Sequence, residues 1–217
     1  GDGTMTMAER LGTTGGVPIV GVPKTIDNDI NGCERSFGFD TAVATVTDAL
    51  ERVQTTGQSH GRVMIVETMG RYAGWIALEA GLAGAADVIL LPEIGYDVAR
   101  IAEVCRARSA RRRATLVCIA EGAKPAGGTM IVERTVEGSP DPIRLGGVAH
   151  ALRAQLQPQL ASEVRATVLG HVQRGGAPTP FDRVLATQYG NEAARLLEEG
   201  IASKASALIC LRRVRTK

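Results

Sequence analysis

The stretch Val63–Ala83, VMIVETMGRYAGWIALEAGLA, contains in order each kind of segment from which the chain is built. Its first four residues form a continuous apolar run, which is typical of a strand buried on both faces of a parallel sheet. Glu67 and then the loop Thr68-Met69-Gly70-Arg71 follow. Apolar residues then recur at three- and four-residue steps from Tyr72 to Ala83, which predicts a helix. The stretch therefore predicts a strand, a polar loop and a helix in succession.

Apolar runs and helical stretches alternate on both sides of this segment. Buried strands are expected at residues 18–22, 88–91, 115–120 and 166–169, and helices at 37–53, 98–110, 147–156 and 181–199. Such alternation is typical of an α/β architecture with a mainly parallel sheet. The Gly- and Pro-rich segment 124–145 is predicted to be a loop with a short strand at Thr129–Val132.

Composition and charge exclude several classes of function. The chain has 217 residues, 44% of them hydrophobic, and a formal net charge of +2, which argues against a partner made of nucleic acid or a membrane surface. The basic run Arg111-Arg112-Arg113 is interpreted as a solvated helix end. No apolar run reaches the roughly 18 residues of a membrane span. We therefore expect a globular protein whose binding sites for anions are local.

The cysteines and the start of the chain carry two further expectations. Cys33, Cys105, Cys118 and Cys210 are widely spaced and form no CxxC pair, which predicts reduced thiols and a cytoplasmic protein. Three histidines are too few to favour a metal site built from imidazoles. The chain opens on Gly1 rather than on Met, with no strand ahead of it, so we expect its front to be missing.

Polar residues concentrate after the predicted strands. Because ligands of parallel sheets bind beyond the carboxyl ends of the strands, these loops are the candidate site. Any one of them alone is better explained as a polar turn. Together they present cations and carboxylates, as a phosphorylated and hydroxylated substrate requires. The charged members are Lys24, Asp27, Asp29, Arg71, Glu121, His171 and Arg174.

Two shorter patterns point to phosphate and metal chemistry. Asp27 and Asp29 would project to the same side of an extended loop, where one carboxylate could accept a hydroxyl proton beside a metal-bound phosphate. The alternative is an Asx-type turn in which Asn28 or Asp29 caps the next helix. Gly1–Thr4, GDGT, is interpreted as a glycine-rich turn for phosphate with Asp2 placed to hold Mg²⁺, although plain turns share this pattern.

Six segments resemble, in family order, the signature segments of 6-phosphofructokinase: GDGT (1–4), PKTIDNDI (23–30), ETMGRYAGWIAL (67–78), LPE (91–93), AEGA (120–123) and RATVLGHVQRGGAPTPFDR (165–183). The resemblance implies two similar Rossmann-like α/β/α domains with mainly parallel sheets. Residues 1–38 with 174–200 would be the remainder of the nucleotide or phosphoryl-donor domain. Residues 39–173 would be the fructose 6-phosphate domain, and residues 201–217 would form an atypical tail.

The resemblance also implies a reaction. The family transfers the γ-phosphoryl group of Mg-ATP to the 1-hydroxyl of fructose 6-phosphate, which gives fructose 1,6-bisphosphate in glycolysis. Asp27 would be the base, with Asp29 as a supporting carboxylate. Thr25 would touch the transferring group, and Arg71 would stabilise its charge. Gly1, Asp2, Gly3, Thr4 and Lys24 would bind the donor, with Asp2 holding Mg²⁺.

By the same resemblance, His171 and Arg174 would bind the 6-phosphate and Glu121 the sugar hydroxyls. Thr25, Ile26, Asp27, Met69, Gly70 and Arg71 would complete the sugar site. Arg62 and Arg165 would reach the phosphate from a neighbouring subunit, which implies a homo-oligomer, commonly a dimer of dimers. The alternatives are a surface charge for Arg62, a hydrogen-bonded strand-end histidine for His171, and a partnership of Glu121 with Lys124.

Two residues bear on the identity of the phosphoryl donor, Gly3 and Lys24. Gly3 leaves open the space in which pyrophosphate-dependent members commonly carry an aspartate, and this favours ATP, whereas Lys24 is typical of pyrophosphate users. The alternatives are therefore a pyrophosphate-dependent phosphotransferase and a non-catalytic sugar-phosphate-binding fragment. About a third of the family chain normally precedes GDGT, so we expect this fragment to be inactive alone. Gln54 replaces an arginine with which some bacterial members bind effectors.

Overall fold

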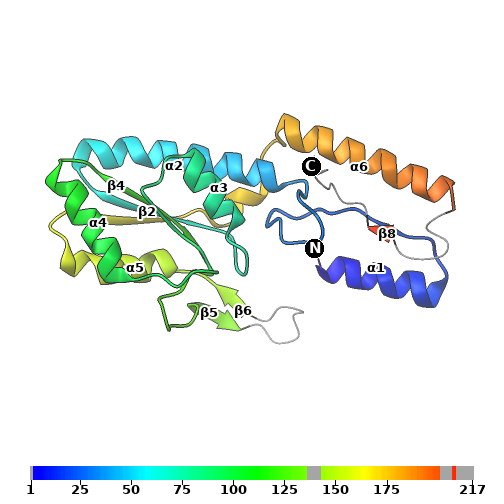
Figure 1. Cartoon of the computed structure of the whole chain (residues 1–217), viewed down its shortest axis with the longest axis horizontal. Helices are drawn as coiled ribbons and strands as arrows, with labels where there is room; N and C mark the ends of the chain where they lie inside the picture. Colours follow the sequence, from blue (N-terminus) through cyan, green and yellow to red (C-terminus); the bar gives the residue numbers. More distant parts are fainter. Residues whose placement is uncertain (1, 136–142, 201–206, 209–217) are drawn as a thin grey trace, which may run out of the picture. The chain divides into compact units, whose positions relative to one another are not determined.

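The computed structural model describes residues 2–135, 143–200 and 207–208 (Figure 1). The chain divides into two compact units. The first unit comprises Gly1–Thr41 and Ala177–Lys217, and the second comprises Ala42–Gly176. The domain boundaries expected from the sequence were 38/39 and 173/174. The functions expected for the two domains stay predictions.

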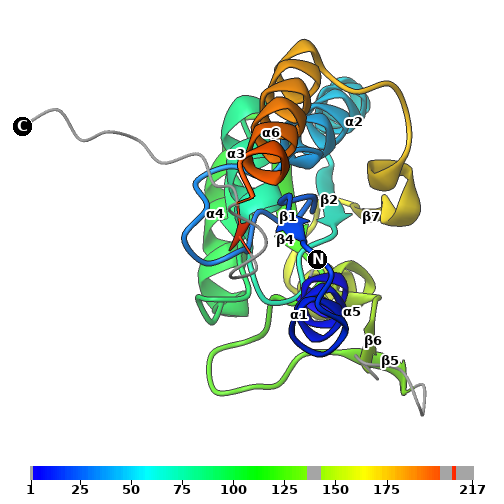
Figure 2. The same cartoon turned by 90° about the vertical axis from the view of Figure 1, so that its right-hand side faces the viewer.

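A four-stranded parallel sheet forms the centre of the second unit. Its order is β3-β4-β2-β7, and every neighbouring pair is parallel. The strands are β2 (Val63–Thr68), β3 (Val88–Leu90), β4 (Thr115–Ala120) and β7 (Val164–Val168). Every residue of β2 and β4 is buried, as expected for central strands covered on both faces. Figure 2 shows β7 beyond β2 at the edge of the sheet. The predicted α/β fold class is confirmed.

Helices cover both faces of this sheet (Figure 1). On one face, Ile65 and Val117 share a hydrophobic core with α4 (Val98–Ala110) and α5 (Val148–Leu156). On the other face lie α2 (Phe39–His60) and α3 (Trp75–Ala83). Here Gly81 of α3 packs so closely that a Cβ would lie 2.8 Å from the side chain of Ile89. The two cores fix the sheet, and the sheet fixes the loops at its ends.

The described part of the first unit contains fewer helices and strands than the second unit. It contains α1 (Asp2–Gly15), β1 (Val20–Gly21), α6 (Pro180–Glu198) and β8 (Ala207–Leu208), and β1 pairs in parallel with β8. Leu185 and Tyr189 of α6 pack against Val20 and Phe37. The Tyr189 hydroxyl also donates a hydrogen bond of 2.8 Å to the carbonyl of Arg35, which ties α6 to the loop before α2.

The starts of α2 and α6 are joined inside the first unit. Asp182 Oδ2 accepts hydrogen bonds from the backbone N–H and the hydroxyl of Thr41, at 2.8 and 2.5 Å. Thr179 donates its N–H to Thr41 Oγ1 at 3.1 Å and its hydroxyl to Asp40 Oδ2 at 2.6 Å. Side chains of each helix start thus satisfy backbone donors of the other.

Two expectations about local structure were wrong. Asp2–Thr4 form the first turn of α1 rather than a glycine-rich turn, while Gly1 lies outside the described residues. Glycine is tolerated at a helix start, so Gly3 did not exclude a helix. The short strand expected at Thr129–Val132 is instead β5 (Val132–Thr135), paired antiparallel with β6 (Ile143–Leu145). Apart from β8, the predicted tail lies outside the described residues.

The prediction of reduced thiols holds for two cysteines and is wrong for one. Cys105 and Cys118 are free and buried, and burial raises the pKa of the Cys118 thiol to about 12. Cys33 is disulfide-bonded. Wide spacing in sequence does not limit closeness in space, which explains the error. Cys210 lies outside the described residues. Of the helices described, none combines the length and the apolar character needed to cross a membrane.

Candidate functional site

Three loops gather at the carboxyl ends of neighbouring strands in the second unit. Met69–Arg71 follows β2, Glu121 follows β4, and the 3₁₀ turn η2 (Gly170–Arg174) follows β7. Because β4, β2 and β7 are adjacent and parallel, the three loops leave the same edge of the sheet. Of the residues predicted to bind the sugar phosphate, Met69, Gly70, Arg71, Glu121, His171 and Arg174 lie in these loops.

Backbone hydrogen bonds hold the loops after β2 and β4 together. Glu121 N–H donates to the carbonyl of Thr68 at 2.8 Å, and Gly122 N–H donates to that of Gly70 at 3.1 Å. Gly70 has φ of +131°, a conformation that only glycine adopts readily. The two loops therefore have a fixed spacing that does not depend on their side chains.

A cavity of about 420 Å³ lies at this edge of the sheet. Met69, Glu121 and His171 line it, whereas Gly70, Arg71 and Arg174 are not among its lining residues. Its volume falls within the range of small-molecule sites, roughly 300 to 1,000 Å³. The cavity thus combines an imidazole, a carboxylate and an apolar side chain, a set that can bind a polar, negatively charged small molecule.

Among the cavity side chains that sequence reasoning missed are the ionisable ones of Glu67 and His150. Glu67 is 2% exposed, and its carboxylate accepts hydrogen bonds from the backbone N–H of Gly147 at 3.3 Å and of Ala149 at 2.8 Å. It therefore caps the start of α5 from inside the sheet. A carboxylate within an otherwise apolar strand was the available signal, because such groups are rarely buried without partners.

Arg71, the predicted stabiliser of phosphoryl charge, is half-buried beside the cavity loop. Its Cζ lies 5.8 Å from the ring centroid of the exposed Tyr72, within the range of a cation–π contact. The carbonyl of Arg71 lies against Gly122, where a Cβ would come within 1.9 Å of it. The backbone of Arg71 is thereby fixed from the β4 side.

The predicted base, Asp27, belongs to the first unit. Thr25 is 9% exposed, and its hydroxyl donates to Asp27 Oδ2 at 3.3 Å and accepts from Asp27 N–H at 3.2 Å. Asp27 is half-buried and Asp29 is exposed. Ile26, predicted to touch the substrate, is 7% exposed and is a core residue. Asp27 and Thr25 are thus coupled, whereas Ile26 contributes packing.

The expectation of an extended loop around Asp27 was wrong. Asn28 has φ of +53°, so alternation along a strand does not position the two aspartates. The Asn28 amide donates to the Glu34 carbonyl at 3.0 Å and accepts from Ser36 N–H at 2.8 Å. The alternative of a locally bonded Asn28 is closer to the structure, with the side chain closing the loop before α2 rather than capping that helix.

The residues predicted to bind the phosphoryl donor belong to the first unit. Gly3 and Thr4 are exposed in the first turn of α1, and a Cβ on Gly3 would meet nothing within 4 Å. Lys24 is exposed. Among the residues that the structure describes, no group of three potential ligands could hold a metal ion by itself. Asp2, the residue predicted to hold Mg²⁺, is the first residue of α1.

Arg62 and Arg165 lie at the opposite end of the sheet from the cavity. Arg62 immediately precedes β2, and Arg165 is the second residue of β7. Both form ion pairs with Glu163, and the Arg62 Nε to Glu163 Oε2 distance is 2.6 Å. Burial raises the pKa of Glu163, but hydrogen bonds and charges of the two arginines outweigh it and leave this pKa below its ordinary value.

A sequence model of the family described as phosphofructokinase matches residues 1–197 of the chain. The chain belongs to this family. A relative named ATP-dependent 6-phosphofructokinase 2, from Clostridium perfringens, is 50% identical over 96% of the chain and 57% of its own length. A relative named pyrophosphate–fructose 6-phosphate 1-phosphotransferase, from Streptomyces coelicolor, is 48% identical over 96% of the chain and 61% of its length.

Solved phosphofructokinases share the fold. The Saccharomyces cerevisiae phosphofructokinase superposes with a TM-score of 0.78 at 30% identity, over 97% of the chain and 30% of that chain. Pichia pastoris phosphofructokinase in the T-state gives a TM-score of 0.79 at 31% identity, over 98% of the chain and 24% of that chain. The present chain thus spans somewhat more than half the length of the curated relatives named above.

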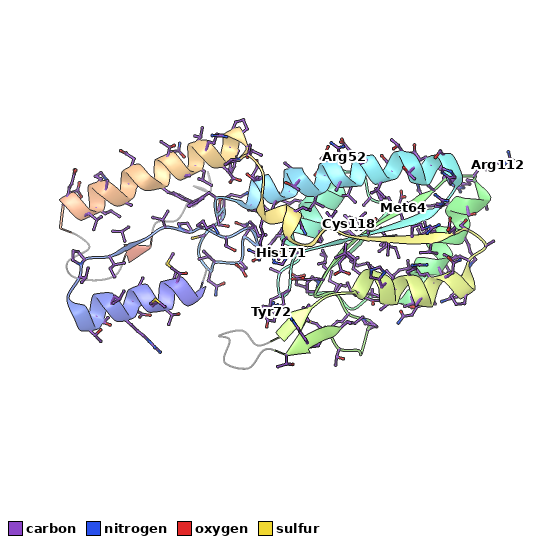
Figure 3. All side chains as sticks on the ribbon, turned by 180° about the vertical axis from the view of Figure 1, so that it is seen from behind. Arg52, Met64, Tyr72, Arg112, Cys118 and His171 are labelled. Carbon is purple, nitrogen blue, oxygen red and sulfur yellow. The ribbon has the colours of Figure 1, made fainter. Side chains whose placement is uncertain are left out.

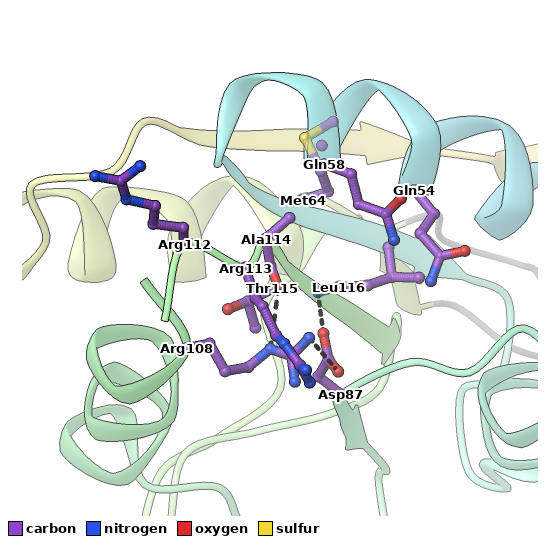
Figure 4. A pocket seen from close by; sticks show the side chains of 11 residues that line it. Gln54, Gln58, Met64, Asp87, Arg108, Arg112, Arg113, Ala114, Thr115 and Leu116 are labelled. Atoms are coloured by element: carbon purple, nitrogen blue, oxygen red, sulfur yellow. Dashed lines mark hydrogen bonds and ion pairs between the residues drawn. The ribbon is translucent and has the colours of Figure 1, made fainter. Parts of the chain in front are cut away.

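The second unit has another cavity, of about 400 Å³, at the amino ends of the strands (Figure 4). Arg108, Arg112 and Arg113 line it together with Gln54 and Asp87. Arg108 pairs with Asp87 at 2.9 Å, and Asp87 also accepts from Leu116 N–H at 2.9 Å. Figure 3 shows Arg112 far from His171 within the second unit, so the two cavities are separate.

Proposed function

We propose that this chain provides the fructose 6-phosphate site and the proton-accepting carboxylate of an ATP-dependent 6-phosphofructokinase. The observation that carries the proposal is the cavity in which Met69, Glu121 and His171 meet. Membership of the phosphofructokinase family supports it, since these side chains come from the segments that resemble the family signature. The free thiols of Cys105 and Cys118 fit a cytoplasmic location, and the Cys33 disulfide is the observation against it.

In this proposal His171 and Arg174 bind the 6-phosphate, and Glu121 accepts hydrogen bonds from sugar hydroxyls. Met69 and Gly70 form the wall of the sugar site. Arg62 and Arg165 bind the phosphate held by a neighbouring subunit, because a six-residue strand separates Arg62 from the cavity loop. At about 3.3 Å per residue such a strand is roughly 20 Å long, too far for these side chains to reach the cavity of their own chain.

The chemical step transfers one phosphoryl group. The 1-hydroxyl oxygen of the sugar attacks the terminal phosphorus of ATP, the bond from that phosphorus to the ADP oxygen breaks, and the hydroxyl proton passes to Asp27. Thr25 is hydrogen-bonded to Asp27 and touches the transferring group. Arg71 stabilises its charge, and Asp29 is a supporting carboxylate. Mg²⁺, with Asp2 as one ligand, would neutralise charge on the donor phosphates.

Pyrophosphate is the alternative donor. Relatives named for either donor are almost equally similar to the chain, at 50% and 48% identity, so overall similarity does not separate them. We propose ATP because Gly3 leaves open, uncharged space at the start of α1. The exposed Lys24 is the feature that favours pyrophosphate.

The first test is binding of fructose 6-phosphate to the 217-residue chain by isothermal titration calorimetry. We expect binding that His171→Ala weakens at least about tenfold, because a charge-assisted hydrogen bond to phosphate is lost. The matched control is His60→Ala, an exposed histidine on α2 that should leave affinity unchanged. Equal affinity of the wild-type and H171A chains would contradict the proposed site.

The second test concerns turnover. We expect none from the 217-residue chain alone, and turnover from a chimera that joins it to the unmatched part of the Clostridium perfringens relative. In the chimera, Asp27→Asn should lower kcat by about 10² to 10⁴ with little change in KM, the range expected for loss of a general base. Asp48→Asn on the exposed face of α2 is the control. A D27N chimera within tenfold of wild-type kcat would remove Asp27 from this role.

A further inference from the structure

Gln173 connects two loops of the cavity and is almost completely buried, at 1% exposure. Its Oε1 accepts a hydrogen bond from the backbone N–H of Met69 at 3.1 Å. Its Nε2 donates to the carbonyl of Gly170 at 3.0 Å. Both ends of the buried amide are therefore bonded to backbone, one in the loop after β2 and one at the start of η2.

With this side chain, the Met69–Arg71 loop is hydrogen-bonded to the neighbouring loops on both sides. On the β4 side the flanking residue Thr68 and the loop residue Gly70 accept hydrogen bonds from the backbone of Glu121 and Gly122. On the β7 side, Gln173 supplies the corresponding hydrogen bond. A buried amide with both ends satisfied has one favourable orientation, because moving it would leave buried polar groups unpaired. The distance between the loop and η2 is therefore set by the length of one side chain.

We propose that Gln173 is a positioning residue that sets the spacing between the sugar-binding loop and the phosphate-binding turn. The inference rests on the proposed function, in which Met69 contacts the sugar while His171 and Arg174 bind the phosphate. A ligand that contacts both loops needs this spacing, whereas inorganic phosphate contacts the turn alone. Gln173 thereby favours a sugar phosphate of the right length over free phosphate, by preorganising two loops rather than by touching the ligand.

The test compares two ligands on the 217-residue chain. Gln173→Met keeps the length of the side chain and removes both hydrogen bonds. We expect Q173M to weaken fructose 6-phosphate binding about tenfold and inorganic phosphate binding less than about twofold, because preorganisation is lost for the ligand that spans both loops. Dissociation constants come from calorimetry, with NMR titration for the weaker ligand. A general loss of structure would weaken both ligands alike.

Gln157 provides a matched control. At the amino end of β7 its Nε2 donates to the Ser162 carbonyl at 3.2 Å and its Oε1 accepts from Val164 N–H at 2.9 Å. Gln157→Met thus removes the same pair of hydrogen bonds away from the cavity. Urea denaturation should show a loss of stability in both variants, and only Q173M should change the ratio of the two dissociation constants.

A measurement on the wild-type chain keeps the inference testable if Q173M does not fold. The Met69 N–H should be protected from hydrogen exchange, because its acceptor is buried, and exchange at the rate of an open loop would overturn the inference. If the wild-type chain binds fructose 6-phosphate and Q173M binds both ligands with unchanged or equally weakened affinity, the positioning role alone is wrong. If the wild-type chain binds no fructose 6-phosphate, the proposed function fails, and the inference fails with it.

Discussion

At the scale of single residues, Gly122 shows how the site is built with backbone as much as with side chains. A Cβ at this position would lie 1.9 Å from the carbonyl oxygen of Arg71 and 2.7 Å from its carbonyl carbon. These atoms cannot move aside as the end of a flexible side chain could. The close approach brings the loop after β4 into hydrogen-bonding contact with the loop after β2, so glycine at 122 is required by geometry.

Gly122→Ala should therefore displace the Met69–Arg71 loop. We expect a loss of about 1–3 kcal/mol in the free energy of unfolding, and weaker binding of fructose 6-phosphate, because the added methyl group forces the loops apart. Urea denaturation and calorimetry measure the two effects. Gly190→Ala, within α6 and with nothing within 4 Å of the new Cβ, should be neutral or stabilising. Wild-type behaviour of G122A would contradict the described contact between the loops.

Gly3 carries the proposed preference for ATP. Since a Cβ at Gly3 meets nothing within 4 Å, Gly3→Asp introduces a carboxylate without a steric conflict in the chain. In the chimera we expect G3D to raise the KM for ATP at least about tenfold through repulsion of its phosphates, with pyrophosphate use less affected. Initial rates with each donor give the answer, and unchanged ATP kinetics would count against the electrostatic account.

At the scale of elements, the sequence best predicts the strands that are buried on both faces of the sheet. The apolar runs at 63–66 and 115–120 are β2 and β4, and the helix expected at 98–110 is α4. β2 continues through Glu67 and Thr68, both buried, because partners outside the strand satisfy these polar side chains. A pattern of apolar residues contains no information about such partners, so the predicted strand ends too early.

Glu67 links the sheet to α5, so replacing it should destabilise the contact between them. Glu67→Gln puts an amide donor opposite one of the two backbone N–H groups that the carboxylate now accepts from. We expect a loss of about 1–3 kcal/mol in the free energy of unfolding, as for other buried donors left without an acceptor. Glu103→Gln on the exposed face of α4 should change stability by less than about 0.5 kcal/mol. Equal effects of the two variants in urea denaturation would contradict the capping role of Glu67.

The loops were predicted less well than the elements they join. Residues at the carboxyl ends of β2, β4 and β7 could be predicted to gather, because topology alone brings them to one edge. The left-handed conformation of Asn28 could not be predicted, because it depends on hydrogen bonds to Glu34 and Ser36 several residues away. The pairing of Glu163 with both Arg62 and Arg165 likewise needs the register of β2 with β7.

At the scale of the whole molecule, the second unit presents predicted phosphate ligands at both ends of one sheet. His171 lines the cavity at the carboxyl ends of the strands, whereas Arg62 and Arg165 stand at the amino ends. One chain cannot bring both sets to the same phosphate. If both sets act in the reaction, each complete site must contain side chains of two subunits.

This arrangement predicts complementation between two inactive variants of the chimera. His171→Ala removes the cavity imidazole, and Arg62→Ala with Arg165→Ala removes the opposite set. In a dimer of one H171A chain with one R62A/R165A chain, one of the two sites is intact, so random mixing should restore about a quarter of wild-type turnover. Steady-state rates before and after remixing measure this. Activity no higher in the mixture than in its parts would show that the sites are not shared.

The second unit is continuous in sequence, and the chain leaves for it just after Thr41 and returns just before Thr179. Because Thr179 N–H is bonded to Thr41 Oγ1, the exit and the return are adjacent. A continuous block with neighbouring ends is a cassette, one that recombination can replace without altering the path of the surrounding chain.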